Sequence, residues 1–181
     1  MQMNPTLVVI DLRKENKMKK HLYLMMGVPG SGKSTYAKNI LKNGDIYVSR
    51  DEIRYSLLTD EDDYFAKENE VIKTFIESVD KSLGMEEYYG DVFADATHLS
   101  PKSRAQVLNQ LKNKDRVSVI YLDIPLNVIL ERNAKRTGRA LVPEDVVRRM
   151  YNSIQLPTRA EGIESIYFIN ENQEIKEVRN L

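Results

Sequence analysis

The sequence predicts an α/β fold in three layers, with helices on both faces of a central, mainly parallel sheet of five strands. Short apolar runs alternate with longer segments of helical periodicity, as βαβ units require. A glycine-rich segment joins the first strand to the first helix. The chain has 181 residues, 41% hydrophobic and 30% charged, and this suits a single globular domain.

Five apolar runs are the predicted strands. The first, HLYLMM, is apolar along most of its length, as expected for a strand buried on both faces of a sheet. The strands are expected at residues 21–26, 45–49, 91–95, 116–125 and 165–170.

Helices are predicted between these strands. Pro101 starts one of them behind Ser100 as N-cap, because proline suits the first position of a helix. The longest begins near Tyr64, and its apolar positions at helical spacing are Ile72, Ile76, Val79 and Leu83. The others are expected at 33–41, 51–58, 126–135 and from Pro143, with an apolar face of Val146, Val147, Met150 and Ile154.

Composition excludes several classes of protein. Without cysteine the chain has neither a disulfide framework nor a thiolate metal site, and two histidines are too few for a histidine-built metal centre. Lys plus Arg equals Asp plus Glu, 27 each, which argues against a broad positive surface for nucleic acid but allows a locally basic groove. No membrane-spanning run or signal peptide is evident, so we expect a cytoplasmic protein.

The start of the chain is expected to lie outside the compact domain. Residues 1–18 form an N-terminal extension, in which TLVVI suits an extra edge strand, and residues 19–181 form the domain itself.

The glycine-rich segment, GVPGSGKS, matches the G-x-x-x-x-G-K-[ST] pattern in the required context, between a strand and a helix. Glycines let successive N–H groups face phosphate oxygens, Lys33 neutralises the β- and γ-phosphates, and Ser34 ligates Mg²⁺. The alternative is a glycine-rich turn that binds nothing. The fold is therefore predicted to be a P-loop NTPase, with ATP and Mg²⁺ held at Gly27, Pro29, Gly30, Ser31, Gly32, Lys33, Ser34 and Thr35.

Three classes of P-loop protein compete. A switch GTPase needs D-x-x-G, which is absent, and the NKDR at Asn113 precedes its strand instead of following it. A motor ATPase needs a longer chain. A small kinase fits best, because the rest of the chain offers an acceptor site and a lid.

The acceptor site is expected after the second strand, in SRDEIR. Carboxyl ends of parallel strands form the ligand crevice, so Asp51 would lie near the glycine loop and accept the proton of an attacking hydroxyl. Arg54, one turn later, suits an anionic acceptor. The alternative for Asp51 is a helix N-cap.

The third strand ends in DATHLSPKSR, where Asp95 is the preferred metal-side carboxylate together with Ser34. We expect Asp95, Thr97 and Arg104 to contribute to the acceptor site; turn or cap roles are the alternative. Asp123 competes for the metal, although Ile124-Pro125 suggests that it caps a helix. For His98 we expect a surface or loop role.

A lid is expected in ERNAKRTGRALVPEDV, where Arg132, Arg136 and Arg139 lie along one helical face and Gly138 permits a break. An arginine brought to the transferring phosphoryl group accelerates transfer, and closure excludes water. We expect Arg136 to be the main contributor, catalytic with Asp51 and Lys33. Arg132 and Arg139 assist it at the nucleotide.

Together GVPGSGKST, SRDEIR, DATHLSPKSR and ERNAKRTGRALVPEDVVRRMYNSI, in this order, resemble the kinase domain of bacteriophage polynucleotide 5′-hydroxyl kinases and the small P-loop kinases around it (the AAA_33 and zeta-toxin-like group). The resemblance covers residues 19–154. It implies a helical lid and transfer of the γ-phosphate of ATP to a 5′-hydroxyl of DNA or RNA. It also implies Asp51 as general base, Arg54 on the acceptor's 3′-phosphate and Arg136 as lid arginine.

Two departures leave the acceptor open. His98 stands where that family commonly has asparagine, and RTGRALVP is longer than the matching lid. The alternatives are a small-molecule kinase, for a nucleoside, nucleotide sugar or antibiotic, and a non-catalytic ATP-binding module. Tyr55, Tyr64, Phe65, Tyr88 and Tyr89 lie in segments that could border the acceptor cleft, where bases of a nucleic acid could stack on them. The alternative is that these aromatic residues fill the core and the seams between helices.

Overall fold

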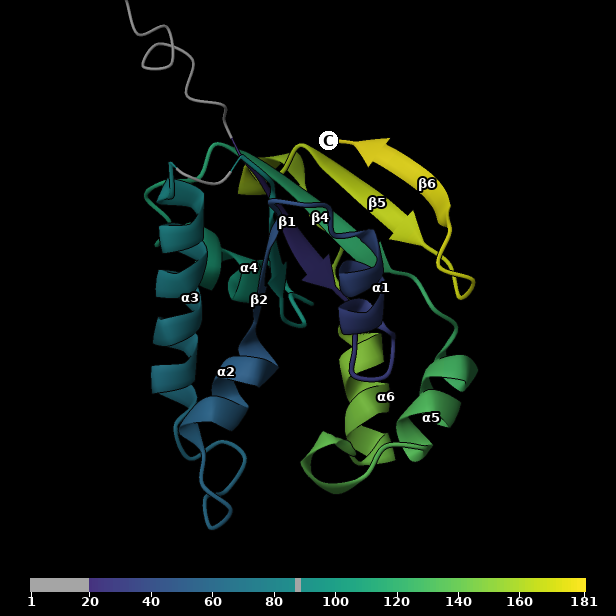
Figure 1. The fold of residues 1–181 in the computed structure, drawn as a ribbon. Coiled ribbons are helices and arrows are strands. Elements are labelled where there is room, and N and C mark those ends of the chain that lie inside the picture. Colours follow the sequence, from purple (N-terminus) through teal and green to yellow (C-terminus); the bar gives the residue numbers. More distant parts are fainter. Residues whose placement is uncertain (1–19, 87–88) are drawn as a thin grey trace, which may run out of the picture.

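A computed structural model describes residues 20–86 and 89–181. Its middle layer is a six-stranded sheet in the order β2-β3-β1-β4-β5-β6 (Figure 1). Neighbours from β2 to β5 pair in parallel, and β6 is antiparallel to β5. The strands are β1 (His21–Met26), β2 (Ile46–Ser49), β3 (Val92–Asp95), β4 (Arg116–Leu122), β5 (Ser165–Ile169) and β6 (Ile175–Asn180).

The predicted α/β fold with a mainly parallel sheet is confirmed, but the number of strands was wrong by one. The sixth strand, IKEVRN, is exposed along its whole length, and even its large apolar residues Ile175 and Val178 are about half exposed. The strand therefore buries no apolar face, and its sequence lacks the hydrophobic pattern from which a strand is predicted. It forms because β5 offers it a backbone edge to pair with.

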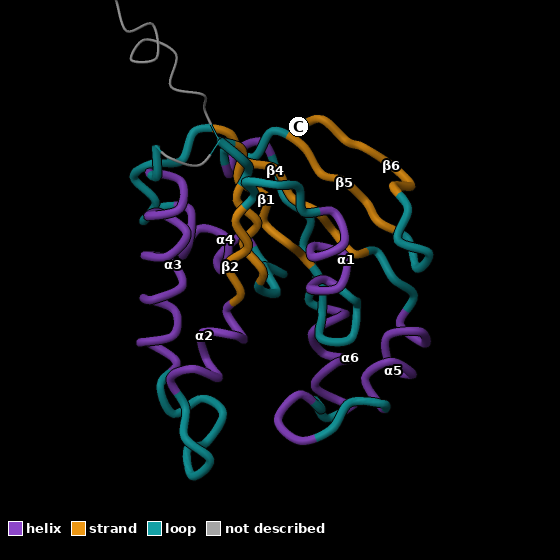
Figure 2. Tube along the Cα trace, viewed as in Figure 1, coloured by secondary structure: helices purple, strands orange, loops and turns teal. Residues whose placement is uncertain are grey.

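Helices cover both faces of the sheet (Figures 1 and 2). They are α1 (Lys33–Ile40), α2 (Arg50–Leu57), α3 (Glu68–Gly84), α4 (Pro101–Leu108), α5 (Leu126–Ala134) and α6 (Glu144–Asn152), with short 3-10 turns η1 (Gly138–Ala140) and η2 (Arg159–Glu161). Ser100 caps α4 through a capping box, as expected. The long helix α3 begins four residues later than predicted, because residues 63–68 form consecutive turns.

Alternating side chains of β1 supply both core layers. Leu22 and Leu24 belong to the core cluster that includes Phe75 and Val79 of α3. Met25 belongs to a second cluster, with buried residues of α1, α5 and α6. This two-sided burial explains why the strand is almost continuously apolar.

Strand register gathers the polar strand ends at one edge. Asp95 of β3 pairs with Met25 of β1 on one side and with Ser49 of β2 on the other. The glycine loop and the first turn of α2 therefore leave the sheet beside Asp95. This edge is where a parallel α/β sheet binds its ligands.

Two sequence predictions fall outside the described part of the chain. The extension at residues 1–18, with its possible strand, and Tyr88 belong to stretches that the structure does not describe. Within the part that it describes, no helix has the length and apolarity needed to cross a membrane.

Candidate active site

Two positions of the glycine loop have a backbone conformation that favours glycine, and one of them has no room for a side chain. Gly30 and Gly32 have φ values of +86° and +93°, which favour glycine. A Cβ at Gly30 would lie 2.9 Å from the carbonyl oxygen of Ile129 in α5. The loop is therefore held between the sheet and the lid helix α5 by contacts that only glycine allows.

The loop ends in an open helix N-terminus. Tyr36 makes the first helical bond of α1, to the carbonyl of Gly32, and no side chain caps the helix. The N–H groups of Lys33, Ser34 and Thr35 have no backbone partner among the described residues. Unpaired N–H groups with the positive end of a helix dipole suit phosphate oxygens.

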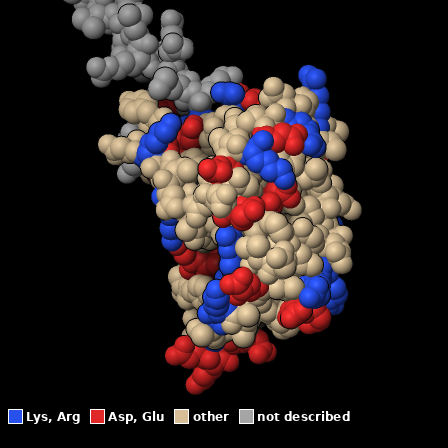
Figure 3. Space-filling model, turned by 90° about the vertical axis from the view of Figure 1, so that its right-hand side faces the viewer, with Lys and Arg blue, Asp and Glu red and all other residues tan. Residues whose placement is uncertain are grey.

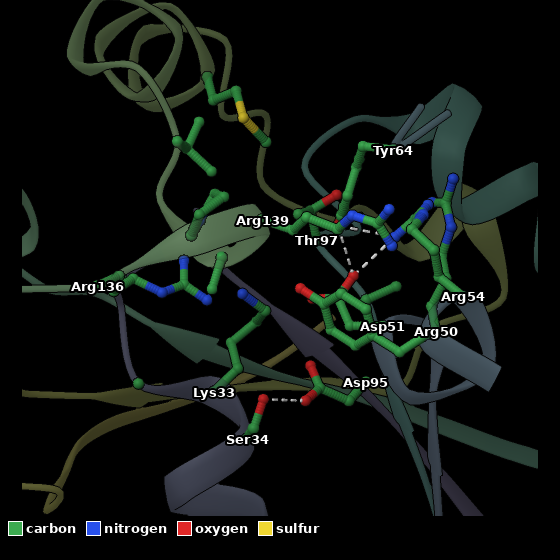
Figure 4. A pocket seen from close by; sticks show the side chains of 18 of the residues that line it. Lys33, Ser34, Arg50, Asp51, Arg54, Tyr64, Asp95, Thr97, Arg136 and Arg139 are labelled. Atoms are coloured by element: carbon green, nitrogen blue, oxygen red, sulfur yellow. Dashed lines mark hydrogen bonds and ion pairs between the residues drawn. The ribbon is translucent and has the colours of Figure 1, made fainter. Parts of the chain in front are cut away.

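A cavity of about 560 Å³ lies over this helix end (Figure 4). It brings together most of the residues predicted for the site, from the loop, α2, the end of β3 and the lid. Gly27 and Ser31 are in the loop but do not line the cavity. The predicted residues that do line it are Pro29, Gly30, Gly32, Lys33, Ser34, Thr35, Asp51, Arg54, Asp95, Thr97, Arg132, Arg136 and Arg139.

Lys33 extends into the cavity (Figure 4), and its Nζ donates to the carbonyl of Val28 at 3.2 Å. Burial lowers its pKa, the carboxylates of Asp95 and Asp51 oppose this shift, and the nearby charge of Arg136 adds to it. An anion beside Nζ would favour the charged form of Lys33.

Ser34 and Asp95 meet at the floor of the cavity. The Ser34 hydroxyl donates to Oδ2 of Asp95 at 2.6 Å, and the Tyr47 hydroxyl donates to the same oxygen at 2.5 Å. Burial, followed by the charge of Asp95, raises the pKa of Tyr47, so Tyr47 stays a donor. A hydroxyl and a carboxylate oxygen fit Mg²⁺, which binds few protein ligands and completes its shell with phosphates and water.

Asp123, the other carboxylate considered for the metal, is engaged elsewhere. Lys176 of β6 lies 2.5 Å from its Oδ2, and Asp123 does not line the cavity. It is not the helix cap either, because Pro125 holds the N-cap position of α5.

Asp51 stands on the opposite wall with a carboxylate that is 58% exposed. Its Oδ1 accepts hydrogen bonds from Arg54 at 2.7 Å and from the Tyr64 hydroxyl at 3.0 Å. Ser49 caps α2 by accepting the N–H of Glu52, so the alternative N-cap role for Asp51 is excluded. The carboxylate is oriented through one oxygen and leaves the other available.

Arg54 is buried, with only 4% of its side chain exposed. Besides Asp51 and Tyr64 it binds Oε2 of Glu68 at 2.6 Å, and its guanidinium packs on the ring of Tyr64. These partners occupy the guanidinium, so this arrangement does not present Arg54 as an open clamp for an acceptor phosphate.

Two further residues of the site, Arg50 and Glu68, were not predicted from the sequence. Arg50 also lines the cavity, and it forms an ion pair with Glu68, which thus holds two arginines of α2. Burial and the charge of Arg54 lower the pKa of Arg50. Arg50 could have been predicted as a site residue because it is adjacent to Asp51 in the sequence. No feature of the sequence around Glu68 indicates its role.

The three lid arginines have different partners. Arg136 lines the cavity, and its guanidinium makes no hydrogen bond or ion pair to the rest of the described chain. Arg132 donates to carbonyls of the glycine loop and of Glu171. Arg139 turns instead to the loop between α2 and α3. Asn133, which was also missed, closes the lid loop by bonding both backbone groups of Val142.

Two predictions need correction. Arg104 was assigned to the substrate, but it is fully buried and absent from the cavity lining; its guanidinium bonds Glu161 and the carbonyls of His98 and Gln155. It therefore ties α4 to the segment after α6.

His98 lies in a loop as expected, yet it is buried and not on the surface.

The glycine loop opening α1, the hydroxyl–carboxylate pair beneath it and the arginine lid above it define a P-loop kinase scaffold. Residues 22–157 match the AAA_33 (AAA domain) family, and the chain belongs to this family.

Three known proteins are similar to this chain in sequence or in fold. L-seryl-tRNA(Sec) kinase of Methanococcus maripaludis is 29% identical over 182 residues, covering 88% of this chain and 68% of that protein. A sugar kinase from Janibacter sp. HTCC2649 has a TM-score of 0.60 at 20% identity, covering 86% and 87% of the two chains. The Pnkp1/Rnl/Hen1 RNA repair complex contains a chain with a TM-score of 0.59 at 23% identity, covering 74% and 43%. The two solved structures share the fold.

Proposed function

We propose that this protein transfers the γ-phosphoryl group of ATP to a hydroxyl group, with Asp51 as general base. One observation carries the proposal: Lys33 and Asp51 face one cavity from opposite walls, above the Ser34–Asp95 pair. Phosphates on the helix end would therefore meet a hydroxyl beside Asp51.

In this mechanism the acceptor oxygen attacks the γ-phosphorus, the bond to the bridging oxygen of ADP breaks, and the hydroxyl proton passes to Asp51. Arg54 and Tyr64 hold Oδ1, so Oδ2 receives the proton. Lys33 and Arg136 stabilise the charge that develops on the transferred group. Ser34 and Asp95 would hold Mg²⁺, which supplies positive charge at the phosphate oxygens when bound.

The first acceptor class is the 5′-hydroxyl end of DNA or RNA. The motifs shared with polynucleotide kinases support it, and so does the fold shared with a chain of an RNA repair complex. Tyr55 and Phe65 line the cavity with 43% and 68% of their surface exposed, as stacking of a base requires.

The second class is a small hydroxyl compound, and two observations favour it. Arg54 is already paired with two carboxylates, so it offers no free charge to a backbone phosphate. The α2–α3 loop beside the cavity carries exposed Asp60, Glu61 and Asp63, at an end of the molecule where acidic side chains gather (Figure 3). These charges would repel a long polyanion. A sugar kinase shares the fold of this chain, which also supports this class.

The test is transfer of label from γ-labelled ATP to 5′-hydroxyl oligonucleotides of DNA and RNA, to nucleosides and to sugars. Lys33→Ala serves as the inactive control. Labelled oligonucleotide supports the first class, and labelled small compounds without labelled oligonucleotide support the second. If ATP binds with ordinary affinity and no acceptor in a broad panel is labelled, the chain is a non-catalytic ATP-binding module and the proposal is wrong.

A further inference from the structure

Two walls of the cavity meet at one guanidinium group. Arg139, in η1 of the lid, donates from Nη2 to the carbonyl oxygens of Thr59, Asp60 and Asp62 at 2.7, 2.9 and 2.9 Å. Across the described part of the chain, no other hydrogen bond or ion pair links residues 134–142 to residues 58–67. The polar connection between lid and acceptor wall therefore depends on this side chain.

The acceptor loop, residues 58–63 between α2 and α3, presents backbone oxygens to a cation. The Asp62 carboxylate accepts both the N–H and the hydroxyl of Thr59, and these bonds lower its pKa. Lys67 lies 3.6 Å from Asp62 and donates to the carbonyl of Leu57. The Asp60 and Asp62 carbonyls accept no hydrogen bond from any described residue except Arg139. A preformed loop thus directs unsatisfied oxygens at a single donor.

The side chains of Arg136 and Arg139 in the lid point to different parts of the site. Gly138 has a φ of +57°, and a Cβ placed there would meet no atom within 4 Å, so conformation and not space explains the glycine. Arg139 follows this turn toward the acceptor loop, whereas Arg136 lies near Lys33 (Figure 4). The partners of Arg139 are carbonyl oxygens, and Arg136 is left for the phosphates.

We propose that Arg139 is a positioning residue that couples acceptor binding to lid closure, an inference that rests on the proposed function. An acceptor in the cavity contacts Tyr64 and Phe65, which directly follow the acceptor loop. This contact stabilises the arrangement of the three carbonyls on which Arg139 is docked, and the docked lid holds Arg136 over the site. Closure with an acceptor in place excludes water, so transfer is favoured over hydrolysis of ATP.

Kinetics of Arg139→Ala and Arg139→Lys test the coupling. A lost charge-assisted bond predicts that Arg139→Ala raises the KM for the acceptor, and the ratio of hydrolysis to transfer, by about 10-fold. Arg139→Lys should restore part of both, because an ammonium also donates to carbonyls. Lys135→Ala is the matched control, since Lys135 is an exposed lid cation paired with Glu131 and should change neither value. An unchanged acceptor KM, with ATP affinity reduced as strongly as in Arg136→Ala, would make Arg139 a phosphate ligand and overturn the proposal.

Hydrogen exchange gives a readout that needs no acceptor to be known. With a non-hydrolysable ATP analogue bound, amides of residues 59–67 should exchange about 10-fold faster in Arg139→Ala than in the wild type, with α3 unchanged. Equal exchange in the two proteins would show that Arg139 does not hold the acceptor loop, whatever the acceptor is, and would overturn this inference. If Arg139→Ala exchanges faster but the wild type labels no acceptor, the contact between Arg139 and the acceptor loop is supported and the proposed function is wrong.

Discussion

At the scale of single residues, the role of Asp51 depends on its neighbours. Ser49 caps α2, which frees the Asp51 side chain from the backbone, and Arg54 with Tyr64 then fixes one of its oxygens. Glu68 in turn holds Arg54. A carboxylate on the first turn of a helix thus acquires a fixed orientation at the mouth of the phosphate site.

Asp51→Asn should lower turnover by about 100-fold or more and leave ATP affinity nearly unchanged, because the amide keeps the shape but cannot take a proton. Steady-state kinetics with a labelled acceptor, together with ATP binding, measure both. Glu52→Gln is the control, since Glu52 is exposed and pairs with Lys38 outside the cavity. Equal turnover in Asp51→Asn and the wild type would exclude Asp51 as the base.

His98 predicts a pH dependence of stability. Burial, with added charge from Arg50 and Arg104, lowers its pKa to about 3, so the folded protein keeps it neutral. The unfolded chain binds its proton below about pH 6.5. The stabilisation is therefore complete above pH 6.5 and is lost at about 1.4 kcal/mol per pH unit as the pH falls toward 3.

His98→Asn should remove this dependence. Asparagine tolerates the φ of +46° at this position and does not titrate. Urea unfolding at pH 6.5 and pH 4.5 should show the wild type losing about 2–3 kcal/mol more than the variant. The same loss in both proteins would contradict the assignment.

At the scale of elements, the lid is held by Asn133 at its base. This buried side chain donates to the Val142 carbonyl at 2.7 Å and accepts the Val142 N–H at 3.3 Å, so it closes the loop that carries Arg136 and Arg139. It also packs beside Gly30, which brings the lid base against the glycine loop.

Asn133→Ala should destabilise the protein by about 2 kcal/mol, because two partly buried backbone groups of Val142 lose their partner. Chemical denaturation measures this, and limited proteolysis should cut residues 134–141 faster. Asn39→Ala removes an exposed amide on α1 and should cost less than about 0.5 kcal/mol. Similar values for the two variants would contradict the role given to Asn133.

At the scale of the whole molecule, we propose that residues 19–181 are the kinase domain and residues 1–18 an extension. The buried Lys20 donates to the carbonyls of Ser82 and Met85 and so ties the start of β1 to the end of α3. A chain of residues 19–181 should retain the unfolding free energy within about 0.5 kcal/mol and the same acceptor kinetics. Loss of cooperative unfolding would show that the extension is part of the fold.

Much of the architecture follows from local pattern. Residues 21–26 are buried on both faces and therefore apolar, and the glycine spacing after them needs only the two neighbouring elements. The edge with Asp51 and Asp95 follows as well, because parallel strands place their carboxyl ends together. The strand β6 was missed because its residues are exposed and stabilised only by pairing with β5.

By itself the sequence determined the order of the first five strands and the six helices along the chain, the phosphate loop and the carboxylates at its edge, since these depend on residues close in the chain. Tertiary structure alone decided which arginines keep a charge available to a ligand. Arg54 is bound by Glu68, Arg104 by Glu161 and Arg139 by carbonyls some 80 residues away. An arginine has the same charge in any sequence, and only the partner that the fold brings to it decides whether that charge is available to a ligand.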